Sequence, residues 1–262
     1  MSVDSAAEEV LHGRILDEAA RLIEAASGRS LHLRVTGSIA VRMHSGSHAP
    51  LLDLMGRRRF RDIDFWGYAK EQKQVEQLLE KDGYLADPTI KQAHEWGVKR
   101  LIYEHPQTRI KIDVFMDELV MAHTIHFKGR LELDFPTIDL ADLLLSKLQI
   151  HEITENDFID MIVLLADHKL GAGDHELIDM SYISGILRND WGFCHTTLEN
   201  LRKSGEAVGR HDLPPEVADN VRTRITAIAE QIESAPKSTR WKLRARVGTR
   251  SKWYEDVDDV HR

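Results

Sequence analysis

The sequence predicts an α/β protein with a mixed α/β first half and a helical second half. Before Pro136, short segments that alternate apolar and polar residues stand between segments of helical periodicity, which indicates both strands and helices. After Pro136 the apolar residues recur at helical spacing. From this change we expect a first domain over 1–136, a helical domain over 137–235 and a tail over 236–262.

The first half should open with a long helix, because Ile15 and Leu22 belong to a helical apolar pattern and Gly28 can end it. Further elements are expected in chain order. They are a helix at 5–27, a strand at 31–35, a short helix at 39–45, a strand at 61–66, a helix at 71–82, strands at 98–104 and 108–116 around the turn His105-Pro106-Gln107, and a hairpin at 123–134 with Lys128-Gly129 at its tip.

The second half should contain helices near 139–152 and 155–168, followed by helices over 174–234 that are interrupted at Gly192 and Pro214-Pro215. Thr154 with Asp157 three residues later predicts a capping box at the start of the second of these helices. The tail is divided by charge. Seven Lys and Arg residues and no acid occur in 236–252, and four acids follow in 255–259.

Composition excludes several classes of protein. Hydrophobic residues at 42% and charged residues at 30% are ordinary for a globular protein, so a collagen-like or mainly disordered chain is excluded. The net charge of −8 excludes a basic nucleic-acid coat. The single cysteine, Cys194, excludes an intramolecular disulfide and a cysteine-rich zinc site. With no apolar run of 18 residues and acids near the start, we expect a soluble cytoplasmic protein with no membrane partner.

Two carboxylates on the second predicted strand point to a metal site. Asp62 and Asp64 are two residues apart, so both side chains leave the same face, while Ile63 and Phe65 leave the other. Two such charges about 4 Å apart repel each other by on the order of 4 kcal/mol at an effective dielectric constant near 20. A divalent cation removes that cost, and ligands that are all oxygen suit Mg²⁺ or Mn²⁺.

A third carboxylate has a matching context. Ile112 and Val114 share an apolar face of a later predicted strand, so Asp113 faces the other way. If the two strands are neighbours, Asp113 completes a cluster of three carboxylates. Gly37-Ser38 stands between a predicted strand and helix, where backbone N–H groups and the helix N-terminus can hold a phosphate group.

These residues resemble the nucleotidyltransferase superfamily, which has the polymerase β-like fold. The resemblance covers roughly residues 30–168. It rests on Val35-Thr36-Gly37-Ser38, Asp62-Ile63-Asp64-Phe65 and Ile112-Asp113-Val114. The later segments 140–148 and 156–160 are similar to the Lys-Leu and Arg-Asp-x-x-Asp helices of the AbiEii-type toxin branch. The implied fold is a mixed sheet flanked by helices and followed by a helical C-terminal region.

The resemblance also implies an activity: transfer of a nucleoside monophosphate from an NTP to an acceptor hydroxyl, with release of pyrophosphate. The implied catalytic and metal-binding residues, for Mg²⁺ or Mn²⁺, are Asp62, Asp64 and Asp113. The implied nucleotide-binding residues are Gly37, Ser38, Lys147 and Asp160. The toxin branch further implies an RNA acceptor such as a tRNA 3′ end, and a possible antitoxin partner.

Several alternatives stay open. The acceptor can equally be a small molecule or a protein hydroxyl. The long connection over 39–61 also fits a non-catalytic nucleotide-binding member of the fold. Lys147 in an apolar helix also fits a side chain that snorkels over the core. Asp157 fits a helix-capping acid, and the basic run 57–59 fits either a solvated loop or a segment that attracts NTP or RNA.

Overall fold

The structure is a computed structural model that describes residues 3–57, 60, 62–88, 99–172 and 176–257. It divides into two compact units that are interleaved along the chain. The first unit consists of Met1–Met43, Arg58–Leu119 and His126–Asp139, and the second of His44–Arg57, Val120–Ile125 and Leu140–Arg262. The predicted fold class is confirmed, because the chain is α/β with a mixed sheet flanked by helices and helices following it.

The first unit contains a five-stranded sheet in the order β1-β2-β5-β4-β3. Its strands are β1 (Arg34–Val35), β2 (Asp62–Gly67), β3 (Leu85–Ala86), β4 (Arg100–Glu104) and β5 (Lys111–Met116). The central pair, β2 and β5, is parallel, and the other pairs are antiparallel. The sheet is therefore mixed, and β4 and β5 form the hairpin expected around 105–107.

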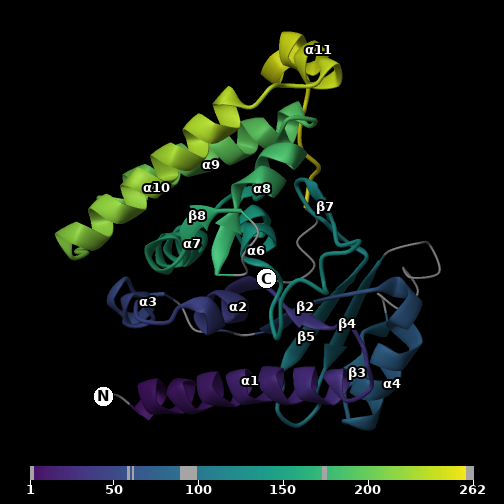
Figure 1. Ribbon diagram of the computed structural model, residues 1–262. Helices are drawn as coiled ribbons and strands as arrows, with labels where there is room; N and C mark the ends of the chain where they lie inside the picture. The colour runs from purple at the N-terminus through teal and green to yellow at the C-terminus, as the bar shows by residue number, and fades with distance from the viewer. Residues whose placement is uncertain (1–2, 58–59, 61, 89–98, 173–175, 258–262) are drawn as a thin grey trace. The chain divides into compact units, whose positions relative to one another are not determined.

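Two helices cover the apolar face of this sheet (Figure 1). They are α1 (Val3–Ser27) and α4 (Gln72–Lys81), the latter preceded by a 3-10 turn, η1 (Ala69–Glu71). Helix α1 contacts β1, β2 and α4. The apolar faces of β2 and β5 are wholly buried, as Ile63, Phe65, Ile112 and Val114 show. Strict alternation therefore leaves the carboxylates of both strands on the opposite face.

The second unit is mainly helical (Figure 1). Its helices are α3 (Pro50–Leu54), α6 (Leu140–Leu148), α7 (Glu155–Asp167), α8 (Met180–Leu187), α9 (Trp191–Val208), α10 (Pro215–Ser234) and α11 (Thr239–Val247), with a final 3-10 turn, η2 (Gly248–Arg250). Helix α6 is buried along its whole length, and α9 and α10 pack side by side and against α7. No helix in the described ranges is long and apolar enough to cross a membrane.

The expected hairpin at 123–134 is wrong. Strand β7 (Thr124–His126) pairs with β6 (Glu118–Val120), which precedes it. The turn at Lys128-Gly129 is real, but the chain beyond it runs to β1. There, Val35 N donates to Pro136 O at 3.1 Å, and Ile138 N donates to Val35 O at 3.0 Å. The backbone of β7 is therefore paired with β6, and the residues that reach β1 lie beyond the expected hairpin.

Other expectations need smaller corrections. The first strand keeps only two of its five expected residues, and the helix from 139 ends at Leu148 rather than 152. The region expected to be helical from 174 begins with a strand, β9 (Leu177–Asp179), parallel to β8 (Lys169–Gly171). The helix break expected at Gly192 comes earlier, because Asp190 caps α9 by accepting the N–H of Phe193.

The C-terminal segment after η2 packs on α9. Trp253 donates its indole N–H to Thr196 Oγ1 at 3.1 Å, and the Tyr254 ring stacks on His151 with 3.5 Å between centroids. Gly192 permits this approach, because a Cβ at this position would lie 2.5 Å from the Trp253 carbonyl oxygen.

We therefore expect Gly192→Ala to loosen the C-terminal segment at a cost of about 1–3 kcal/mol, because the backbone carbonyl must move away from α9. Limited proteolysis should cleave the variant after η2 faster than the wild type. Gly205→Ala is the matched control, since it lies in the same helix with nothing within 4 Å of its Cβ. Equal cleavage rates in all three proteins would contradict the prediction.

Candidate functional site

Three carboxylates share one face of the sheet in the first unit. Asp62 and Asp64 are alternate residues of β2, and Asp64 is the register partner of Asp113 on β5. Register partners in a parallel pair project to the same side of a sheet. Asp62 is exposed, and Asp64 and Asp113 are half-buried. The sequence-based expectation that the two strands are neighbours is thus confirmed.

Asp113 has one satisfied and one unsatisfied oxygen. Its Oδ2 accepts a hydrogen bond from Arg100 Nη2 at 2.8 Å, and the Arg100 guanidinium also lies 5.1 Å from the centre of the Phe115 ring. Its Oδ1 is buried and accepts no hydrogen bond from any described residue. A buried acceptor without a donor is unfavourable, so this oxygen is suited to a ligand.

No group of three or more His, Cys, Asp or Glu side chains in the described residues is already arranged as a metal site. The donor set still suits a hard divalent cation. All three side chains supply oxygen, two of them stand in register on paired strands, and one carries the unsatisfied Oδ1.

A glycine turn lies directly against Asp64. Thr36 N donates to Asp64 O at 2.9 Å, and the chain then enters α2 (Gly37–His44). Gly37 has φ +65°, and a Cβ there would lie 2.8 Å from Asp64 Oδ2. Helix α2 therefore begins at the carboxylates, with Gly37 and Ser38 in its first turn. The N-terminus of a helix carries a partial positive charge, so this turn is suited to an anion.

The other two residues predicted to bind nucleotide, Lys147 and Asp160, lie in the second unit and pair with each other. Lys147 Nζ lies 2.8 Å from Asp160 Oδ2 and 3.1 Å from Asp157 Oδ1. Arg57 donates to the two oxygens of Asp160, with Nε at 2.6 Å and Nη2 at 3.0 Å. The exposed fraction is 7% for Lys147 and 1% for Asp160. We call these four residues the buried ion network.

The charged groups of this network keep one another ionised. Burial alone would raise the pKa of Asp160, but Lys147 and Arg57 outweigh it and hold that pKa below its usual value. Burial likewise opposes the charge on Lys147, and Asp160 and Asp157 together raise its pKa. Asp157 also accepts the Thr154 backbone N–H, so the predicted capping box is confirmed.

Arg57 illustrates what the sequence pattern missed. Its basic run 57–59 fitted either a solvated loop or a segment that attracts NTP or RNA, yet the Arg57 side chain is only 10% exposed and pairs with Asp160. Residues 58–59 lie outside the described residues. Arg100 was also missed, because its contact with Asp113 depends on the register of the β4–β5 hairpin. That signal was accessible in principle, since the turn at 105–110 sets the register.

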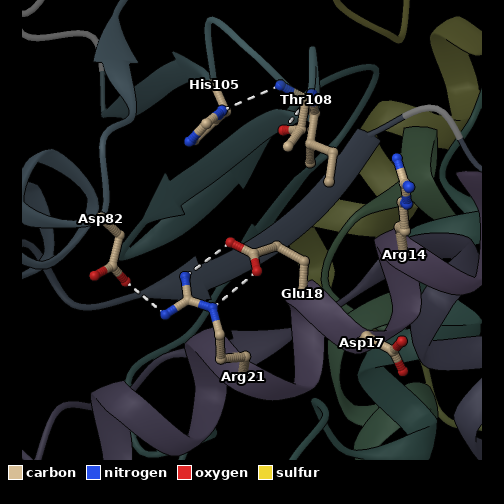
Figure 2. A pocket seen from close by; sticks show the side chains of 8 residues that line it. Arg14, Asp17, Glu18, Arg21, Asp82, His105 and Thr108 are labelled. Carbon is tan, nitrogen blue, oxygen red and sulfur yellow. Dashed lines mark hydrogen bonds and ion pairs between the residues drawn. The ribbon is translucent and has the colours of Figure 1, made fainter.

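The first unit also contains a cavity of about 510 Å³ on the side of α1 (Figure 2). It is lined by Arg14, Asp17, Glu18, Arg21, Asp82, His105, Thr108 and Ile110. Figure 2 shows Arg21 between two acids: it donates to both Glu18 oxygens at 2.8 Å and to Asp82 Oδ2 at 2.9 Å. These charges join α1 to the end of α4. None of the predicted site residues lines this cavity.

No protein-family model and no curated protein matches the chain. Two solved structures are similar to it. The crystal structure of the lincosamide antibiotic adenylyltransferase LnuA with lincomycin bound is 19% identical, covers 56% of this chain and 94% of its own, and gives a TM-score of 0.40. The solution structure of the antibiotic-resistance factor ANT(2'')-Ia is 13% identical, covers 87% of this chain and 91% of its own, and gives a TM-score of 0.35. Values this low do not assign the chain to a family.

Proposed function

We propose that the chain is a metal-dependent nucleotidyltransferase that transfers a nucleoside monophosphate from an NTP to an acceptor hydroxyl. The observation that carries the proposal is the alignment of Asp64 with Asp113 on paired parallel strands, with the Gly37 turn packed against the Asp64 carboxylate. An anion-binding turn beside a set of carboxylates is the arrangement that a nucleotide with a divalent cation requires.

The chain's own residues would divide the work as follows. Asp62, Asp64 and Asp113 would hold Mg²⁺ or Mn²⁺, which when bound neutralises charge on the phosphates. Gly37 and Ser38 would orient the triphosphate through their backbone N–H groups. Asp113 Oδ1, which accepts no hydrogen bond from the described residues, would take the proton of the acceptor hydroxyl. A bond forms from the acceptor oxygen to the α-phosphorus, the bond to the β-phosphate oxygen breaks, and pyrophosphate leaves.

The nucleotide contacts proposed here involve Gly37 and Ser38. Lys147 and Asp160, which the family resemblance also assigns to the nucleotide, have their charged groups bound to each other. Their ion pairs support a role in holding the second unit together.

The acceptor we propose is RNA. The family resemblance would add a toxin-type role and an antitoxin partner. Helix α11 supports RNA, because Arg240, Lys242 and Arg246 are exposed and pair with no acid among the described residues. Exposed cations of this kind bind phosphodiesters and lose affinity as salt rises. Transfer to small hydroxyl compounds with no dependence on salt would favour a small-molecule acceptor instead.

The test is transfer of label from each α-labelled NTP with Mg²⁺ or Mn²⁺, in separate reactions with total RNA and with small hydroxyl compounds. Asp62→Asn/Asp64→Asn should lose roughly 10³-fold or more of the activity, because the charges that hold the cation are gone. Pyrophosphate release should fall in parallel.

The matched control is Asp17→Asn/Asp53→Asn, which makes the same change in net charge at two exposed acids of α1 and α3. It should keep wild-type activity. If Asp62→Asn/Asp64→Asn turns over as well as this control, the proposed site is wrong. If the wild type binds Mn²⁺ and NTP but never releases pyrophosphate, the chain is a non-catalytic nucleotide-binding protein.

A further inference from the structure

We propose that Arg100 occupies the place of a divalent cation at Asp113, so that tight cation binding requires the nucleotide. This inference rests on the proposed function, and it concerns a residue that the sequence motifs do not include. Arg100 would act as a positioning residue: it would keep cation binding weak until the nucleotide is bound.

The hairpin register places Arg100 on the same face as the carboxylates. Ile102 is the register partner of Asp113, and Arg100 is the partner of Phe115. Since alternate residues of a strand share a face, the Arg100 side chain projects beside Asp113 and reaches it diagonally. The 2.8 Å distance from Nη2 to Oδ2 and the guanidinium position over the Phe115 ring agree with this placement.

The ion pair leaves a polar atom unsatisfied on each partner. Arg100 Nε and Asp113 Oδ1 are both buried, and neither has a hydrogen-bond partner among the described residues. The two side chains are 27% and 17% exposed, so solvent screens the pair only in part. A structural salt bridge normally satisfies such atoms, because leaving them buried and unpaired is unfavourable. The pair therefore has capacity for a ligand on both partners.

Charge determines what the ligand must bring. A divalent cation at Asp113 would compete with the guanidinium for one carboxylate, and the two positive groups would then repel each other. Negative phosphate oxygens beside Arg100 remove that repulsion, because a guanidinium binds phosphate well. The cation should consequently bind weakly to the free protein and tightly together with a triphosphate.

The test is the affinity of the full-length protein for Mn²⁺, measured by electron paramagnetic resonance without nucleotide and with a non-hydrolysable NTP analogue. Without nucleotide, Arg100→Gln should bind Mn²⁺ about tenfold more tightly than the wild type, because the competing charge is absent. With the analogue present, this difference should shrink to about twofold or less. Lys99→Gln is the matched control, since it removes the same charge one residue away, where Lys99 pairs with Glu118.

Arg100→Lys covers the case in which Arg100→Gln does not fold. Lysine keeps the charge but loses the planar fork, so its Mn²⁺ affinity should lie about threefold above the wild type. Mn²⁺ affinities no higher than that of Lys99→Gln in both Arg100 variants would overturn the inference.

A parallel measurement on Asp62→Asn/Asp64→Asn separates this inference from the proposed function. If that variant loses Mn²⁺ binding while the Arg100 variants match the control, the site stands and the role of Arg100 is wrong. If that variant keeps wild-type Mn²⁺ affinity, the proposed metal site itself is wrong.

Discussion

Gly37→Ala is expected to reduce nucleotidyl transfer by about two orders of magnitude while leaving most of the protein folded. Two separate costs arise at this position. An alanine at φ +65° costs roughly 1–2 kcal/mol of backbone energy. Its Cβ would also lie 2.8 Å from Asp64 Oδ2, a distance that forces the carboxylate or the turn to move. Because Asp64 and the turn are both parts of the proposed site, either movement separates the anion-binding groups from the carboxylates.

Gly129→Ala isolates the backbone cost. It lies in the same unit with φ +69°, and nothing lies within 4 Å of its Cβ. In thermal unfolding Gly129→Ala should lose only the backbone cost, whereas Gly37→Ala should lose that cost and the cost of the close contact with Asp64. Only Gly37→Ala should lose activity. Binding of a labelled NTP analogue in the presence of Mn²⁺ gives a second readout, and it should weaken in Gly37→Ala alone. A Gly37→Ala protein that is as active as Gly129→Ala would mean that this turn does not hold the nucleotide.

The carboxylate face was predictable because it depends on the period-two alternation of strands. Ile63 and Phe65 on one face require Asp62 and Asp64 on the other, whatever the topology. The position of Asp113 was predictable only on the condition that its strand is a neighbour of the first. That condition is met through a parallel pairing of β2 and β5, which are separated in the chain by η1, α4, β3 and β4. No local pattern specifies such a long-range pairing.

Two of the errors share one physical cause, which is pairing with a partner that lies outside the local pattern. The turn at Lys128-Gly129 forms, yet β7 pairs with β6, and the chain after the turn bonds to Val35 of β1 at Pro136 and Ile138. Similarly, the side chain of Arg57, in the basic run 57–59, binds Asp160, which is more than a hundred residues away in the sequence. Local propensity predicts the turn and the charged residue, but tertiary contacts determine which strand or side chain each of them pairs with.

The buried ion network gives the largest expected effect on stability. Lys147→Met should lower the free energy of unfolding by about 3–5 kcal/mol, because Asp160 and Asp157 would both lose the ammonium group that pairs with them. Asp160→Asn should cost a similar amount by leaving excess positive charge. Urea unfolding at pH 6 measures both. Arg202→Gln, which breaks an exposed ion pair with Glu206 on α9, should change stability by less than about 0.5 kcal/mol.

Coupling and pH distinguish a charge effect from lost packing. Lys147→Met/Asp160→Asn restores charge balance, so its cost should fall below the sum of the single variants by about 1–3 kcal/mol. In the wild type the pKa of Asp160 lies below its ordinary 3.8, so its stabilisation is present above that pH and is lost on acidification. Without Lys147, burial favours the protonated form of Asp160. At low pH this form is populated, and it carries no buried charge. Lys147→Met should therefore be less destabilised relative to the wild type at pH 3 than at pH 6. A deficit that is independent of pH, together with additive single variants, would mean that these side chains stabilise the unit by packing alone.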